Sequence, residues 1–261
     1  KPSASKSIAE ALSDDKPIKR GEEGSKAFWY EFERDGQSFV TAPAVGHLFT
    51  LKQVGKGWDY PFFDVEWIPS FKANNFASFS EPYFRNMEKL AGEAKDVIIA
   101  TDYDDEGEVI GFNILQFILG RKDAERMKFS TMTKTELIES YLHTEKKLNK
   151  NLIESGMTRH YLDWYYGINL TRALTNAIKK GGKRFRILSA GRVQAPVVHM
   201  LAKHEKKIKS FKPKPFWALE AEIKVGGKKF KAEHEKDKLW DKKAADKILK
   251  NANVKKATID K

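Results

Sequence analysis

The order of apolar and polar positions predicts a chain in which strands and helices alternate. Two strand-like runs within residues 28–50 flank Asp35-Gly36, a pair typical of tight hairpin turns. A second alternating pattern follows residue 213 and turns at Gly226-Gly227. Apolar residues at helical spacing predict one helix near the N-terminus and further helices over residues 82–95, 106–119, 156–180, 191–208 and 241–251. The aromatic stretch 58–71 is expected to form an ordered loop.

Residues 97–108, VIIATDYDDEGE, place a β-branched apolar run directly before five carboxylates and a glycine. The run 97–101 predicts a short buried strand, and a helical pattern begins at Glu106. Strand, acidic turn and helix follow one another as in a parallel α/β unit, where ligands bind at the carboxyl ends of the strands. The acidic residues therefore lie where this class of fold binds ligands.

The acidic turn predicts a magnesium site. Asp102 and Asp104 are two residues apart, so in an extended backbone both side chains point to the same side and can share one ion. Crowded carboxylates repel one another, and a hard cation such as Mg²⁺ relieves this repulsion. A solvated turn that binds nothing is the simpler alternative. A calcium loop of the helix-flanked kind is excluded, because its twelfth position is Asn113 and the preceding segment is strand-like.

Composition narrows the class of protein. Of the 261 residues, 41% are hydrophobic, which is enough to bury a core, and there is no apolar run of about 18 residues to span a membrane. The chain has no cysteine, which removes disulfides and thiolate metal sites and fits an intracellular protein.

The net charge of +12 is concentrated near the C-terminus. Residues 178–261 carry 25 Lys and Arg against 9 Asp and Glu. Such a basic region is typical of proteins that bind the phosphate backbone of nucleic acids, although a lysine-rich solubilising surface explains residues 203–261 equally well. Within residues 178–192 there is no acidic residue, and the cations are Lys179, Lys180, Lys183, Arg184, Arg186 and Arg192.

Several motifs together resemble one enzyme family. The sequence DYDDEGE after VIIAT resembles the D-x-D-x-E-G signature of the Toprim domain, and RILSAGRVQAP resembles the SAGRVQ-type motif of type IA DNA topoisomerases. Toprim acids also occur in primases and nucleases, whereas the second motif separates the topoisomerases from them. The motifs KPS (1–3), GHL (46–48) and TRHYLDWYYGINLTRALT (158–175) follow in the family's order and are most similar to topoisomerase III and archaeal topoisomerase I.

The resemblance implies an activity and a set of site residues. In this family a tyrosine attacks a single-stranded DNA segment, forms a 5′-phosphotyrosyl bond and is released by religation, which relaxes negative supercoils or decatenates DNA. Asp102, Asp104 and Glu106 would hold Mg²⁺, and Lys1 would act near the scissile phosphate. The residues matching DNA-contacting positions are His47, Arg159, Asp163, Ser189, Ala190, Gly191, Arg192, Val193 and Gln194.

The resemblance also implies a fold and a domain order. We expect an α/β Toprim domain with a mostly parallel, Rossmann-like sheet over residues 1–149, part of a helical DNA-binding domain over 150–209, and the start of a β-rich arch domain over 210–261. The family's glutamate before KPS and its nucleophilic tyrosine have no counterpart in this sequence. The chain is therefore expected to be an N-terminal portion that is inactive alone. The resemblance also implies a cytoplasmic protein associated with the nucleoid. A non-catalytic Toprim module that binds nucleic acid and a Toprim nuclease are the alternatives.

Overall fold

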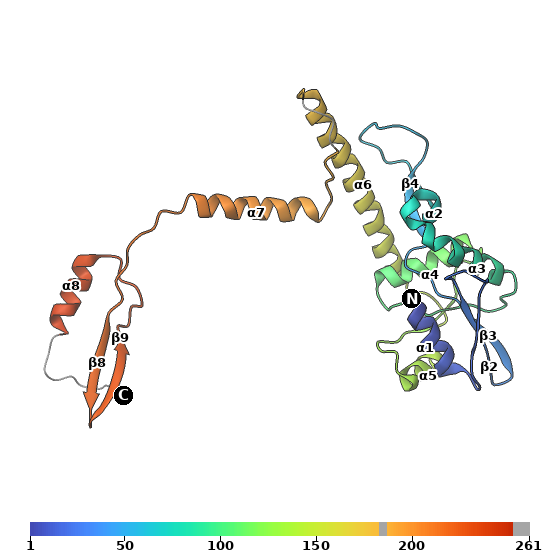
Figure 1. The fold of residues 1–261 in the computed structure, drawn as a ribbon, viewed down its shortest axis with the longest axis horizontal. Helices are drawn as coiled ribbons and strands as arrows, with labels where there is room; N and C mark the ends of the chain where they lie inside the picture. Colours follow the sequence, from blue (N-terminus) through green and yellow to red (C-terminus); the bar gives the residue numbers. More distant parts are fainter. Residues whose placement is uncertain (183–186, 253–261) are drawn as a thin grey trace. The chain divides into compact units, whose positions relative to one another are not determined.

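The computed structural model describes residues 1–182 and 187–252, and the chain divides into two compact units, Lys1–Pro196 and Val197–Lys261. The helices of the first unit are α1 (Pro2–Leu12), α2 (Ser70–Ala73), the 3-10 helix η1 (Asn75–Ser80), α3 (Glu81–Ala91), α4 (Asp105–Phe117), α5 (Lys134–Leu142) and α6 (Lys150–Lys180) (Figure 1). Its strands are β1 (Ile18–Arg20), β2 (Trp29–Arg34), β3 (Gln37–Thr41), β4 (Phe49–Gln53), β5 (Val65–Pro69), β6 (Ile98–Ile99) and β7 (Glu125–Arg126).

The strands of the first unit form three small sheets. Strands β1, β2 and β3 are antiparallel, and the β2–β3 hairpin turns at Asp35 and Gly36, whose φ angles of 49° and 73° suit a two-residue hairpin loop. Strands β4 and β5 are also antiparallel, and α2 begins at Ser70, so the expected loop over 58–71 is wrong at residues 65–71. In the register of this pair, Trp67 stands opposite Leu51, whose side chain is buried.

The predicted α/β class is confirmed, but the sheet differs from the expectation in its pairing. Strands β6 and β7 are parallel, as a strand–helix–strand unit requires, and this is the one parallel pair in the described ranges 1–182 and 187–252. All other pairings within those ranges are antiparallel, so the mostly parallel sheet is not what the described strands form. The strand expected over 97–101 is short, Ile98–Ile99, because the backbone leaves the sheet to form the acidic turn.

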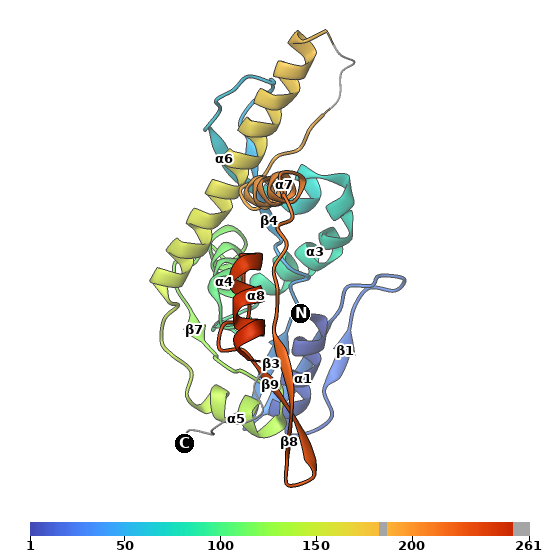
Figure 2. The ribbon, with the colours of Figure 1, turned by 90° about the vertical axis from the view of Figure 1, so that its left-hand side faces the viewer.

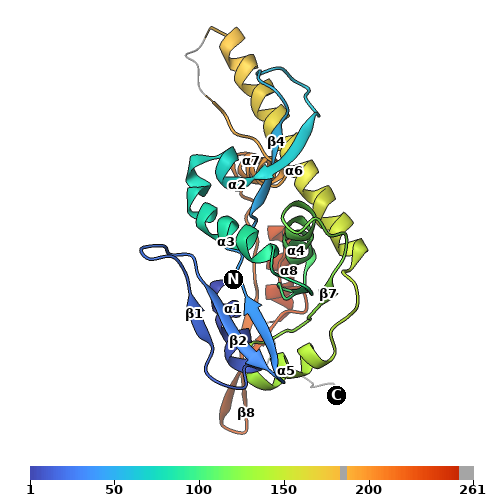
Figure 3. The same cartoon turned by 90° about the vertical axis from the view of Figure 1, so that its right-hand side faces the viewer.

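Two hydrophobic clusters fix helix α4, which begins at the acidic turn. Ile114 packs in one cluster with Leu48 and Phe84, and Leu115 packs in the other with Ile99. Leu115 is completely buried. Figure 3 shows α4 beside α6, and the two helices are in extensive contact. Burial on both sides holds the N-terminus of α4 in one place, which positions the acidic turn.

A third cluster joins α1 to the β2–β3 hairpin and α5 through Ile8, Leu12, Phe32 and Leu137. Helix α1 begins at Pro2, the first helical position that proline favours, and this places Lys1 just before the helix. The N-terminal lysine is thus carried on a helix anchored in the core.

The second unit contains a hairpin, the helix that follows it and most of the helix that precedes it, drawn in orange and red in Figure 2. Strands β8 (Glu220–Val225) and β9 (Lys228–Glu233) pair across Gly226-Gly227, which confirms the predicted turn. Helix α8 spans Lys242–Asn251, and α7 spans Gln194–Lys209. The basic residues Lys183, Arg184 and Arg186 lie outside the described residues. Within the described ranges, no helix combines the length and apolar character needed to cross a membrane.

Candidate active site

The acidic turn is a tight link between β6 and α4. Asp104 is the N-cap of α4, and its Oδ1 accepts a hydrogen bond of 2.7 Å from the backbone N–H of Gly107. Thr101 Oγ1 donates to the carbonyl oxygen of Gly107 at 2.8 Å. A Cβ at position 107 would stand 2.0 Å from the carbonyl oxygen of Asp102, so only glycine fits there. The first turn of α4 is thereby held against the backbone that carries Asp102.

A buried arginine holds the backbone of the same turn in place. Arg126, in β7, and Glu108, in α4, are both 0% exposed and form an ion pair of 3.1 Å. The guanidinium of Arg126 also donates to four backbone carbonyls, those of Ile99, Thr101, Asp102 and Met127. A buried arginine needs such a set of acceptors, and here they belong to the acidic turn and its neighbouring strand. Sequence reasoning missed both residues, because Glu-Arg at 125–126 and Glu108 look like ordinary surface charges.

Lys1 and Asp102 meet although they are separated by almost the full length of the Toprim-like segment. Lys1 Nζ lies 2.5 Å from Asp102 Oδ2. Because the Asp102 carboxylate accepts this hydrogen bond and attracts the ammonium, the pKa of Lys1 is raised above its usual value. Both side chains remain partly exposed, at 63% and 42%. The structure therefore brings together two of the residues that the motifs single out.

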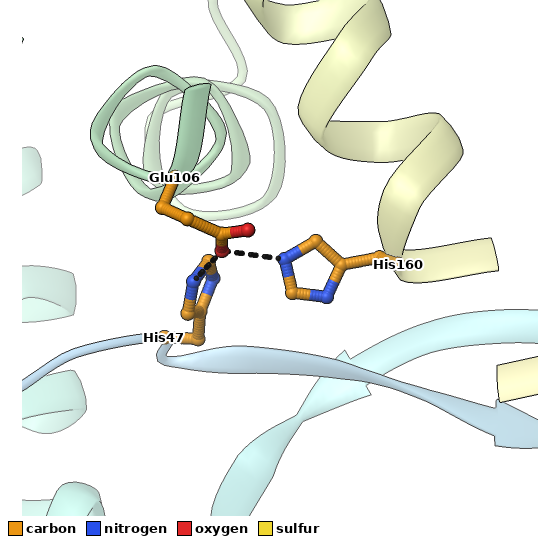
Figure 4. Close-up of side chains that lie close together, drawn as sticks. All are labelled: His47, Glu106 and His160. Carbon is orange, nitrogen blue, oxygen red and sulfur yellow. Dashed lines mark hydrogen bonds and ion pairs between the residues drawn. The ribbon is translucent and has the colours of Figure 1, made fainter. Parts of the chain in front are cut away.

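Glu106 points towards two histidines (Figure 4). Its Oε2 lies 2.8 Å from Nε2 of His47 and 3.1 Å from Nε2 of His160. Burial and the neighbouring His160 lower the pKa of His47, so this ring is neutral at neutral pH. In the part of the chain that the structure describes, these three residues are the group whose metal-ligating atoms all lie within 4.8 Å of one another.

Charged contacts continue from Glu106 to the SAGRVQ segment. Arg159 Nη1 lies 3.3 Å from Glu106 Oε1, and Arg159 Nε lies 3.9 Å from Asp163 Oδ2. Asp163 in turn accepts two hydrogen bonds from Arg192, of 2.7 Å and 3.3 Å. The Arg192 guanidinium holds the pKa of Asp163 below its usual value, and Asp163 raises the pKa of Arg192. Arg159, Asp163 and Arg192 thus form one network with the acidic turn.

Two threonines of α6 hold the segment that precedes α7. The backbone N–H of Ala190 donates to Thr171 Oγ1 at 3.0 Å, and that of Leu188 donates to Thr175 Oγ1 at 3.3 Å. Ser189, Val193 and Gln194 are exposed, while Gly191 and Arg192 are half-buried. The threonines repeat at a spacing of four in TRALT, which puts them on one face of α6; this spacing is the signal that sequence reasoning overlooked.

Comparisons with known proteins agree across the chain. A family model described as Toprim domain matches residues 1–132, and one described as DNA topoisomerase matches residues 147–261. DNA topoisomerase 1 from Pyrococcus furiosus is 41% identical over 259 residues, covering 98% of this chain and 24% of that protein. DNA topoisomerase 1 from Methanocaldococcus jannaschii is 40% identical over 259 residues, covering 98% of this chain and 33% of that protein.

A solved structure gives the same answer for the fold. Full-length topoisomerase I from Thermotoga maritima matches with a TM-score of 0.60 at 20% identity, over 95% of this chain and 36% of that one. The chain spans between 24% and 33% of the two curated relatives named above.

Proposed function

The chain belongs to the type IA DNA topoisomerases, and on this basis we propose that it forms the metal-binding half of an active site that cuts and rejoins single-stranded DNA. In this proposal the strand is held through a 5′-phosphotyrosyl bond to a tyrosine outside the present sequence, and the reaction relaxes or decatenates DNA inside the cell. The chain alone binds single-stranded DNA but neither cleaves nor relaxes it.

The observation that carries the proposal is the line of charged contacts joining motifs far apart in sequence. It runs from Glu106 through Arg159 and Asp163 to Arg192. Lys1 reaches the same acidic turn through Asp102. A phosphodiester needs cations for its own charge and acids for a metal, and this arrangement supplies both on one folded unit.

Lys1 and Arg192, the cations at the two ends of this set of contacts, have separate roles. The Lys1 ammonium is a compact charge that would stabilise the negative charge developing on the scissile phosphate. Arg192 uses Nε and Nη2 to bind Asp163, which orients the guanidinium and leaves its other N–H groups for a phosphate oxygen of the strand. Asp163 is then a positioning residue for Arg192.

Toprim domains bind divalent metal ions, and we propose Mg²⁺ held by Asp102, Asp104 and Glu106. Their carboxylate oxygens are the hard donors that Mg²⁺ prefers, and Asp104 uses only Oδ1 as the helix cap. The buried Arg126 keeps the backbone of Asp102 in place. When bound, the ion would screen the phosphate charge and orient the reacting oxygens for transesterification.

We also propose the division into a Toprim domain (1–149), part of a helical DNA-binding domain (150–209) and the start of an arch domain (210–261). Two boundaries in the secondary structure support it. Helix α6 begins at Lys150 after the N-cap Asn149, and α7 ends at Lys209.

Metal and DNA binding by the full 261-residue chain test the proposal. We expect the double variant Asp102→Asn/Asp104→Asn to lose Mg²⁺ binding in calorimetry while keeping most of its affinity for a fluorescent single-stranded oligonucleotide. We expect Arg192→Ala to lose about tenfold in DNA affinity and to keep Mg²⁺ binding. Arg85→Ala is the matched control, because Arg85 is also a partly exposed arginine paired with carboxylates, on α3.

Three results would contradict the proposal. Equal losses of metal and DNA binding in both variants would show that the two roles are not divided in this way. A covalent DNA adduct formed by the chain alone would place the nucleophile within it. Nicking of supercoiled DNA without a protein-linked end would indicate a nuclease instead.

A further inference from the structure

The two histidines at Glu106 lie in a cluster that the proposed Mg²⁺ site does not explain. His47 comes from the loop before β4, Glu106 from the first turn of α4 and His160 from α6 (Figure 4). Three elements far apart in sequence thus direct two imidazole nitrogens and one carboxylate oxygen at a single point. The Nε2 atoms of both rings approach the same oxygen, Oε2 of Glu106.

We propose that His47, Glu106 and His160 form a binding site for a transition-metal ion of the zinc type. Two histidines, one glutamate and an open fourth position are a donor set typical of zinc sites that keep a water ligand. Imidazole nitrogen favours Zn²⁺, Co²⁺ and Ni²⁺, whereas Mg²⁺ favours sites made of oxygen alone. The site is therefore selective for a different class of ion, and it does not depend on the proposed topoisomerase reaction.

The distances require only a small adjustment. In a tetrahedral zinc site with bonds of about 2.0–2.1 Å, neighbouring ligand atoms are about 3.4 Å apart. The two distances from Nε2 to Oε2 are now 2.8 Å and 3.1 Å, so each pair must separate by a few tenths of an ångström. The metal binds the lone pair of each Nε2, so any proton on that nitrogen leaves for solvent.

The surrounding groups orient the ligands and leave one side open. Arg159 lies 3.3 Å from Glu106 Oε1, so Oε2 is the oxygen that remains for a metal. The His47 and His160 rings pack edge to face at 4.6 Å, and Trp67 packs on His160 at 5.4 Å. The three side chains at the cluster are 25–31% exposed, which gives solvent access for a water ligand.

A hydrogen-bonded cluster that only positions Glu106 is the competing explanation, and metal titration separates the two. The metal-free 261-residue chain is titrated with Co²⁺, whose visible absorption reports tetrahedral coordination, and then with Zn²⁺ by calorimetry. We expect one equivalent of Co²⁺ to bind with an intense tetrahedral spectrum that Zn²⁺ abolishes. His47→Gln and His160→Gln should each weaken zinc binding at least tenfold.

The chain offers a matched control. His199 and His204 lie on the exposed helix α7, and the double variant His199→Gln/His204→Gln should keep the full Co²⁺ spectrum. Absence of saturable uptake by the wild-type chain would overturn the proposal, as would unchanged zinc affinity in His47→Gln and His160→Gln or an equal loss in the control. If a cluster variant fails to fold, the wild-type spectrum still decides: weak, octahedral absorption would refute the site.

Discussion

Replacing Gly107 with alanine tests how tightly the acidic turn is held. In an ordinary helix this substitution is favourable by about 0.5–1 kcal/mol, because alanine loses less backbone entropy than glycine. Here the new methyl carbon would lie 2.0 Å from the carbonyl oxygen of Asp102 and 2.9 Å from its carbonyl carbon. Real Cβ atoms essentially never approach closer than 3.0 Å, so the turn and α4 must separate by at least about 1 Å.

The expected change in the free energy of unfolding is the sum of two unfavourable contributions and one favourable contribution. Overpacking of this kind costs about 1–3 kcal/mol. Weakening the cap between Gly107 N–H and Asp104 Oδ1 costs about 1 kcal/mol more. The helix preference of alanine returns about 0.5–1 kcal/mol. We therefore expect Gly107→Ala to lower the free energy of unfolding by about 1–3.5 kcal/mol.

Magnesium affinity should fall more sharply than stability. Metal sites tolerate deviations of only about 0.2 Å in ligand distance, whereas the substitution displaces Asp102 relative to the helix that carries Glu106 by about 1 Å. The assays are urea unfolding followed by circular dichroism and Mg²⁺ titration by calorimetry. Gly92→Ala is the control, because Gly92 caps α3 at φ −65° and its nearest neighbour to a new Cβ is 3.8 Å away.

The two alanine variants should behave in opposite ways. Gly92→Ala should match the wild type or exceed its stability by a few tenths of a kcal/mol. A Gly107→Ala chain that is as stable as the wild type and binds Mg²⁺ equally well would refute the close packing of Asp102 against α4.

Three further outcomes follow from the site. Arg126→Met should lower the free energy of unfolding, measured in urea, by about 3–5 kcal/mol, because it leaves Glu108 buried without its ion-pair partner. The double variant Arg126→Met/Glu108→Leu should recover much of this loss, and no recovery would argue against the importance of the pair. The pKa of Asp163, measured by NMR, should lie below the usual aspartate value and should rise in Arg192→Ala. The Asp163–Arg192 pair therefore stabilises the fold fully above the usual aspartate pKa, and this stabilisation is lost as the pH falls through the lowered pKa. Because Glu106 is a proposed ligand of both metals, saturating Mg²⁺ should weaken zinc binding, and independent binding of the two ions would refute this sharing.

Features decided by neighbouring residues could be predicted from the sequence. The Asp35-Gly36 and Gly226-Gly227 turns and the helix after the acidic turn all appear where the pattern places them. Turn geometry and helix periodicity depend on residues a few positions apart, so the linear order contains the necessary information. The same holds for the acidic turn itself, whose glycine and carboxylates lie within a few residues of one another.

What the folded chain added is the set of partners for those residues. The sequence predicts that Asp102, Asp104 and Glu106 share one ion, but the structure gives each a different neighbour: Lys1, the N–H of Gly107, and the two histidines. It also turns two ordinary charges, Arg126 and Glu108, into a buried pair. Apart from the local cap between Asp104 and Gly107, these contacts join residues 18 to 101 positions apart. Their energies depend on burial and on the approach of separate elements, which no local pattern encodes. The sequence alone therefore determined the chemistry at the turn, and only the tertiary structure decided which groups surround it.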